Sequence, residues 1–358
     1  MLLMLSIDLV RQLIIYENCG TVIEIVDILT IIISALIVII KVVQHYIYKN
    51  TLNIMIRSSA SDWTVVNNCE SRHIMLRYAN IGRIFFIVQT VFAYTAGFQI
   101  IVGQLPFLSV FSSKQISVNE SVWNFPVGLK CWIPVDKSAW SYGASYLIQS
   151  IQVIIISGGS SGCDAIFFGI AMHICGQYEL LHQSLGELYG SGTIRVPSKS
   201  IVREFVKRHE HLLTLSDYFE MVYNPVILAI VVSNAVLLCI TGLVLLISLQ
   251  SGGNIVTMLG LTVRIYLLLV QLFICSYVGE RLSQQSLELG NAVYNSAWYE
   301  LPPIVANDMV FIILRCTHQV NLTAGNLFVM NIYQFMQMLK TMFSYFSVLR
   351  LAFNVKPQ

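Results

Sequence analysis

A stripe of hydroxyl groups on the last hydrophobic segment could line a path for water. Thr341, Ser344, Tyr345 and Val348 recur at spacings of three or four residues, so they share one face of a helix. A helix surrounded only by lipid has no use for hydroxyl groups, because hydrocarbon offers them no partners. The stripe therefore favours a helix that faces water or another subunit. Packing between helices through small residues is the alternative that stays open.

The composition excludes an ordinary soluble protein. Charged residues make up 11% of the chain and hydrophobic residues 56%, whereas a soluble domain has about 25% charged residues. So few charges cannot solvate the surface of a globular protein of this size. We therefore predict an all-α membrane protein with several spans. The net charge is only +2 and no basic tract occurs, so nothing indicates a nucleic-acid partner.

Uncharged runs predict the membrane spans, because a helix needs roughly 20 apolar residues to cross a bilayer. The uncharged stretch 221–263 is divided by a turn cluster at 250–254, which gives two spans. The hydrophobic stretch 1–16 contains Asp8 and Arg11 and lacks a cleavage site, so we expect the remnant of a span there, not a signal peptide. The remaining predicted spans are 22–43, 81–103, 143–166, 224–249, 257–280 and 324–350.

The Lys and Arg counts predict the orientation, because cytoplasmic loops are enriched in these residues. Segment 41–83 holds six and segment 195–208 holds five, whereas loop 104–137 holds three. The first two segments are therefore expected inside. Asn119 then belongs to an outward-facing glycosylation sequon, and the second sequon at Asn321 would lie inside and stay unmodified.

Several helices are predicted to be longer than the membrane is thick. Apolar periodicity continues from Ser145 past Asp164 to Leu188, about 44 residues or roughly 66 Å. A bilayer core measures only about 30 Å. We expect the excess to form a packed cytoplasmic anchor from regions 167–218 and 281–318. Amphipathic helices that lie on the membrane surface are the alternative.

Short motifs along nearly the whole chain resemble those of the insect odorant receptors. No single tetrapeptide decides this, but the order and spacing of the motifs do, above all in the last eighty residues. The motifs are Asp62-Trp63, Asp164 with His173, Gln177 and Leu181, His209-Glu210-His211-Leu212, Cys275 with Gly279, Ser296-Ala297-Trp298-Tyr299, Leu322-Thr323-Ala324-Gly325 and Ser344-Tyr345.

The resemblance implies a seven-transmembrane-helix fold with a cytoplasmic amino terminus, inverted relative to G-protein-coupled receptors. Only about 22 residues precede the span at 22–43, so we expect a truncated first span. The implied function is an odorant-gated, non-selective cation channel of four subunits in the plasma membrane of olfactory neuron dendrites. An odour-tuned subunit would assemble there with the shared co-receptor, in contact with membrane lipid. Leu351 stands where the co-receptor tends to carry Gln, which favours an odour-tuned subunit.

The resemblance also implies that the last helix lines the pore. Val348 side chains from four subunits would then form a hydrophobic constriction that closes by dewetting. Thr341 and Leu351 are the next candidates on the two sides of Val348, with Ser344 and Tyr345 on the same stripe. Contact of Val348 with lipid or with a neighbouring helix is the alternative.

The odorant pocket is expected to be apolar, because volatile odorants bind mainly by desolvation and shape. The resemblance implies a pocket in the outer half of the membrane, among the second, third, fourth and later spans. The candidate residues are Tyr94, Gly97, Phe98, Ile101, Tyr146, Ser150, Val153 and Tyr266. Ordinary packing between helices is the alternative for each of them.

Other kinds of chemistry find little support in the sequence. No nucleophile, base and orienting group gather in one region, so neither an enzyme nor a cofactor is predicted. The eight cysteines show no paired metal spacing. His209 and His211 point to different helix faces, which favours a solvated or interfacial role over a metal site. A gustatory receptor is the closest alternative, followed by a G-protein-coupled receptor.

Overall fold

The computed structural model describes residues 22–66, 68–102, 139–189, 199–250, 255–296 and 298–354. The expected span at 1–16 and the sequon at Asn119 lie outside these residues. The elements are α2 (Val22–Ile47), α3 (Lys49–Val65), α4 (Cys69–Val102), α6 (Ala139–Tyr189), α7 (Lys199–Gln250), α8 (Ile255–Asn295), η2 (Trp298–Glu300), α9 (Pro303–Cys316), β1 (Thr323–Ala324), β2 (Phe328–Val329) and α10 (Ile332–Asn354). Among them, α2, α4, α6, α7 and α8 are long and apolar enough to cross a membrane.

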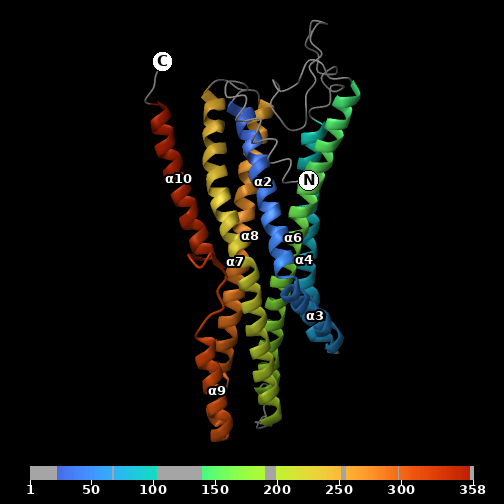
Figure 1. Cartoon of the computed structure of the whole chain (residues 1–358). Coiled ribbons are helices and arrows are strands. Elements are labelled where there is room, and N and C mark those ends of the chain that lie inside the picture. The colour runs from blue at the N-terminus through green and yellow to red at the C-terminus, as the bar shows by residue number, and fades with distance from the viewer. Residues whose placement is uncertain are drawn as a thin grey trace.

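The three longest helices run well beyond the thickness of a bilayer. Helices α6, α7 and α8 contain 51, 52 and 41 residues. At 1.5 Å per residue their lengths are about 77, 78 and 62 Å, against a bilayer core of about 30 Å. They run side by side, with α2 and α4 along their upper part and α9 along their lower part (Figure 1).

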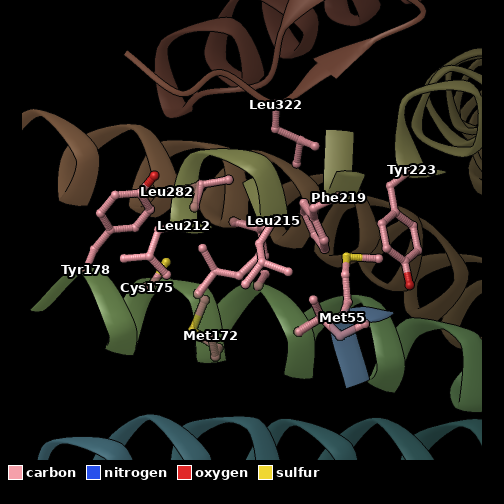
Figure 2. Packing of buried hydrophobic residues seen from close by; sticks show 14 of the residues in the cluster. Met55, Met172, Cys175, Tyr178, Leu212, Leu215, Phe219, Tyr223, Leu282 and Leu322 are labelled. Atoms are coloured by element: carbon pink, nitrogen blue, oxygen red, sulfur yellow. The ribbon is translucent and has the colours of Figure 1, made fainter. Parts of the chain in front are cut away.

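The long extensions pack against one another through a continuous apolar core. Tyr178 of α6, Leu212 of α7, Leu282 of α8 and Met309 of α9 are all almost completely buried in it. Figure 2 shows several of these side chains meeting between the helices. Each buried large apolar side chain contributes about 1.5–3 kcal/mol relative to exposure. The lower bundle therefore has the core of a folded domain.

His209 belongs to this core, which corrects the expectation of a solvated or interfacial role. Its side chain is buried, and its Nε2 lies 3.7 Å from the Cys316 sulfur, whereas His211 is exposed. His209 precedes the uncharged stretch 221–263 and therefore lies in the extension of α7, outside the predicted span. Burial, together with the positive charge of Arg315, lowers the pKa of His209 to about 4. The imidazole is therefore neutral at physiological pH and packs as part of the core.

The last helix begins later than the span predicted at 324–350. Strands β1 and β2 pair antiparallel, with Thr323 opposite Val329. Gly325 and Asn326 between them have φ values of 60° and 57°, a left-handed conformation that a right-handed helix cannot include. Asn331 then caps α10, because its Oδ1 accepts a hydrogen bond from the Gln334 N–H (2.7 Å).

Two glycines of α8 allow the last part of the chain to pack directly on the backbone of that helix. A Cβ on Gly290 would lie 2.6 Å from the Cys316 Cβ. A Cβ on Gly279 would overlap with the Met330 carbonyl oxygen, which belongs to the backbone just before α10. The glycines therefore fix how closely α9 and the hairpin approach α8.

Gly279→Ala is expected to lower the free energy of unfolding by about 1–3 kcal/mol, because the new methyl group must push the backbone at Met330 away. The measurement is the thermal unfolding temperature of the purified full chain in detergent. Gly169→Ala is the matched control, since no heavy atom lies within 4 Å of a Cβ at this helical position. Equal unfolding temperatures for the two variants would contradict this account of the contact.

Candidate functional site

A cavity of about 540 Å³ lies among the end of α2 and the middle parts of α4, α6, α7 and α8. This volume is typical of small-molecule pockets, which measure about 300–1,000 Å³. Much of the wall is apolar and comes from four different helices. The apolar side chains include Phe85, Phe92, Phe167, Val226, Ile230 and Val270. A small, mostly hydrophobic molecule could be held there by desolvation and shape.

One part of the cavity wall carries a buried ion pair. Lys41 is only 1% exposed, and its Nζ lies 2.6 Å from Asp164 Oδ1. The same Nζ donates to Ser160 Oγ (3.3 Å), while Gln89 Nε2 donates to Asp164 Oδ2 (2.8 Å). A buried charge needs a partner and further hydrogen bonds to offset the loss of water. The four side chains therefore form one connected polar group, contributed by α2, α4 and α6.

Seven of the eight predicted odorant-binding residues lie on α4 and α6, and none of these seven lines the cavity. Tyr266 of α8 does line it. Tyr94 and Phe98 are exposed on α4, and the Tyr94 hydroxyl lies 2.9 Å from where a Cβ of Gly158 would be.

The other predicted residues gather in a small contact between α4 and α6. The Tyr146 hydroxyl donates to the Ile101 carbonyl, and Ser150 Oγ donates to the Tyr146 carbonyl (2.8 Å). Val153 is buried in a cluster with Ile28 and Ile32, against which Ile101 packs. Gly97 faces the same helix, because a Cβ there would lie 3.1 Å from Ser157 Oγ. Within a single chain, these residues therefore pack against one another and against their immediate neighbours.

The hydroxyl stripe on α10 has no partner helix among the described residues. Tyr345 and Val348 are each 61% exposed, and Thr341 and Ser344 are exposed as well. Leu351 belongs to α10, but its side chain lies outside the described residues. A different face of α10 packs on the bundle through Phe335, Met338, Met342 and Phe346. In Figure 1, α10 leans away from the other helices towards its end.

The hairpin before α10 is tied to α7. The Thr323 N–H donates to Glu220 Oε2 (2.9 Å), and Asn224 Nδ2 donates to Asn326 Oδ1 (2.7 Å). The Gly325 N–H also donates to the Asn224 carbonyl (3.3 Å). Tyr223, the residue before Asn224, lines the cavity. One turn of α7 therefore contacts both the cavity and the base of the terminal helix.

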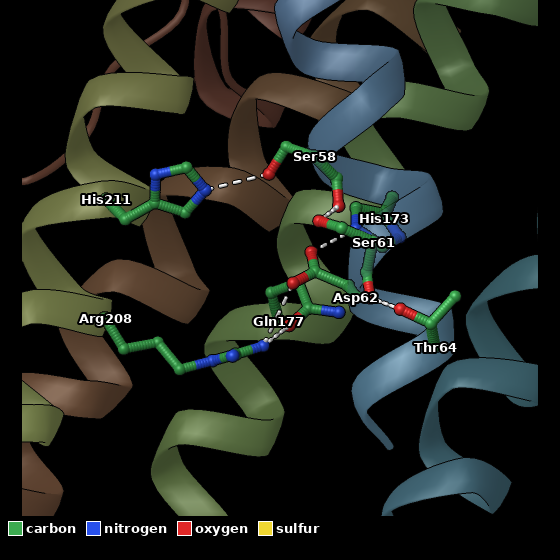
Figure 3. Close-up of polar contacts among 8 residues, drawn as sticks. All are labelled: Ser58, Ser61, Asp62, Thr64, His173, Gln177, Arg208 and His211. Atoms are coloured by element: carbon green, nitrogen blue, oxygen red, sulfur yellow. Dashed lines mark hydrogen bonds and ion pairs between the residues drawn. The ribbon is translucent and has the colours of Figure 1, made fainter.

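Several of the motif residues in the lower part of the helix bundle meet in a polar network (Figure 3). Asp62 Oδ2 lies 3.0 Å from His173 Nε2, and Asp62 Oδ1 lies 3.4 Å from Arg208. The same Arg208 guanidinium donates to Gln177 Oε1. The network joins α3, α6 and α7 below the cavity. These motif positions therefore hold helices together and do not line the cavity.

Comparison with known proteins decides the class. A model of the family described as 7tm Odorant receptor matches residues 21–343. The chain belongs to this family. Membership confirms the resemblance seen in the motifs and favours an odorant receptor over the gustatory and G-protein-coupled alternatives. The chain is thus a multi-pass membrane protein of a family of receptors, not of enzymes.

Similar receptors are found in flies and mosquitoes. Odorant receptor 13a of Drosophila melanogaster is 25% identical over 265 residues, which are 69% of this chain and 61% of that receptor. Odorant receptor Or1 of Anopheles gambiae is 25% identical over 253 residues, which are 61% of this chain and 58% of the relative. This receptor chain therefore spans about three fifths of the length of these relatives.

The fold is shared with solved insect receptors. The olfactory receptor OR5 from Machilis hrabei in complex with eugenol matches with a TM-score of 0.74 at 15% identity, covering 98% of this chain and 88% of that chain. A second structure of OR5 from Machilis hrabei gives a TM-score of 0.72 at 14% identity, covering 97% of this chain and 87% of that chain. The all-α membrane fold implied by the resemblance is therefore confirmed.

The sequence did not single out most of the side chains that line the cavity. In the sequence, Lys41 contributes only to the count of cytoplasmic positive charges, and Gln89 is one polar residue in an otherwise apolar run. Lys41 and Asp164 are 123 positions apart in the sequence, and this separation carries no signal that would predict their ion pair. Lys41 lies near the end of the predicted span 22–43, and Asp164 lies near the end of the predicted span 143–166. This placement is the available hint, because an ionisable residue inside a span needs a partner.

Lys41→Met is expected to destabilise the protein by about 3–5 kcal/mol, because it leaves the Asp164 carboxylate, whose side chain is only 16% exposed, without its counter-charge. The double variant Lys41→Met with Asp164→Asn should recover most of this loss, since neither charge then remains. The measurement is the thermal unfolding temperature of the three purified proteins. A single variant as stable as the parent would show that Asp164 does not depend on Lys41.

Proposed function

We propose that this chain is an odour-tuned subunit of an odorant-gated, non-selective cation channel in the plasma membrane. The observation that carries the proposal is the exposed hydroxyl stripe on α10, whose other face packs on the bundle. If four subunits place their α10 helices around one axis, the hydroxyl stripes would face a shared water-filled pore. Val348 would then form the hydrophobic constriction and Thr341 a polar ring beside it.

The cavity between α2, α4, α6, α7 and α8 is the proposed odorant site. Its volume and its largely apolar wall suit a small volatile molecule. Eugenol, the molecule in complex with OR5 of Machilis hrabei, is of this small and largely apolar kind. Tyr266 is the predicted residue that lines the cavity; the roles of the other seven in odorant binding stay a prediction.

Coupling between cavity and pore would pass through α7. An odorant that makes better contacts with Tyr223 in the open state binds that state more tightly than the closed state. The difference between the two affinities sets how far the equilibrium shifts towards the open channel. Raising a one-percent open fraction to one half requires about 2.7 kcal/mol. A few well-packed rings supply this amount on usual burial scales. Asn224, next in the chain, would pass the displacement to Gly325 and Asn326 at the base of α10.

The proposed partners are a volatile odorant, membrane lipid and the family's co-receptor in a four-subunit assembly. The exposed apolar side chains of α9, among them Phe311 and Leu314, give the lower bundle a surface for such an assembly. Membrane placement in the dendrite of an olfactory neuron follows from the proposed role in olfactory signal transduction.

The proposal is tested by recording current from cells that express the full chain with the co-receptor, across a panel of volatiles. We expect at least one volatile to evoke a fast cation current that the co-receptor alone does not give. Sugars and bitter compounds should evoke none. A response only to those tastants would favour a gustatory receptor, and a current abolished by blocking G proteins would contradict the channel.

Val348→Ser is expected to raise the resting current without odorant, because a polar side chain keeps the constriction wetted. The current should rise several-fold at an equal amount of protein on the cell surface. Ser347→Ala, on the neighbouring position of the same helix, is the control and should leave the resting current unchanged. An unchanged resting current in Val348→Ser would place the gate elsewhere.

A further inference from the structure

The polar part of the cavity wall has hydrogen-bonding capacity that the described residues do not use. A lysine ammonium has three N–H donors, and Lys41 meets two acceptors, Asp164 Oδ1 and Ser160 Oγ. Gln89 gives its amide N–H to Asp164 Oδ2, while its own Oε1 is buried without a donor among the described residues. One donor and one acceptor are therefore left over beside the same carboxylate.

The two unused groups belong to side chains that bind the two oxygens of one carboxylate. Lys41 Nζ lies 2.6 Å from one oxygen and Gln89 Nε2 lies 2.8 Å from the other. Both residues line the cavity. A single small polar group on a bound molecule could accept from Lys41 and donate to Gln89 at once.

We propose that this cavity selects odorants that carry a hydroxyl group, held between the Lys41 ammonium and the Gln89 amide oxygen. The inference rests on the proposed function and names the ligand class of the same site. A hydroxyl group both donates and accepts, so it matches both unused groups. A carbonyl oxygen accepts only and leaves Gln89 unsatisfied, and a hydrocarbon satisfies neither.

The charge of the site excludes ionised ligands. Asp164 already neutralises Lys41 at 2.6 Å. A carboxylate or an alkylammonium would bring a further charge into a largely apolar cavity without a counter-charge, which is costly. A neutral alcohol avoids this cost, and it keeps the existing ion pair intact.

The rest of the wall suits the hydrocarbon part of an alcohol. Phe92, Ile230 and Val270 line the cavity from α4, α7 and α8. Because Lys41, Ser160, Asp164 and Gln89 form one connected group, the oxygen of the ligand has a defined place and its chain extends along the apolar wall. The cavity would therefore orient the odorant as well as bind it.

Three eight-carbon volatiles test the inference: octanol, octanal and octane. Each is titrated against the purified full chain, and the readout is the concentration that gives half of the maximal rise in unfolding temperature. We expect octanol to act at about tenfold lower concentration than octanal, and octanal at lower concentration than octane, as one hydrogen bond is lost at each step. The binding readout does not depend on the co-receptor or on an open pore.

Two variants assign the preference to the proposed groups. Gln89→Met keeps the shape of the side chain but removes the amide, so octanol should lose its advantage over octanal. Gln152→Met is the matched control, because Gln152 is also a buried glutamine whose Oε1 has no donor among the described residues, but it does not line the cavity. It should keep the order of the three volatiles. In the paired variant Lys41→Met with Asp164→Asn, octanal should fall to the level of octane, and octanol should keep only the part of its advantage that comes from donating to the Gln89 amide oxygen.

The outcomes separate the inference from the proposed function. If the three volatiles bind equally well, or if the order survives in Gln89→Met and in the paired variant, the hydroxyl preference is wrong while the odorant site stands. If a water molecule occupies the polar groups permanently, octanol again shows no advantage and the inference fails. If no volatile of any class stabilises the chain or evokes a current with the co-receptor, the proposed function fails as well.

Discussion

The structure depends on the excess of helix length over membrane thickness. Helices α6, α7 and α8 are about twice as long as a bilayer core requires, at about 62–78 Å against about 30 Å. Apolar side chains on the extensions cannot be covered by lipid, so they must cover one another. The shared core around Tyr178, Leu212 and Leu282 does this. It fixes the positions of the helices on which both the cavity and the terminal helix are built.

The ion pair between Lys41 and Asp164 is the second constraint. Burying two charges is costly, and the cost is offset only when each charge has a counter-charge and further hydrogen bonds. Ser160 and Gln89 provide these bonds, and the arrangement joins three helices at the cavity. The same bonds leave one donor and one acceptor over. A structural requirement of the fold thereby places a hydrogen-bonded polar group in the wall of a mostly apolar pocket.

The terminal helix combines a fixed base with a face that a single chain does not cover. Glu220 and Asn224 of α7 hold the hairpin at Thr323 and Asn326, and Gly279 lets this region pack against the backbone of α8. Above this base, α10 touches the bundle on one side and leaves Tyr345 and Val348 exposed. A helix held at one end and supported on one side is positioned mainly by its base, which is the property that the proposed gate would use.

The sequence by itself determined the membrane class, the all-α fold, the long extensions and the family, because charge, apolar periodicity and motif order are properties of the linear chain. It also predicted that Thr341, Ser344, Tyr345 and Val348 share a face. Only the tertiary structure decided the later start of α10, because the left-handed turn at Gly325 and Asn326 forms between packed elements. It also placed His209 in the core and Lys41 beside Asp164. No spacing predicts these contacts, since which partner a side chain meets depends on how distant helices cross.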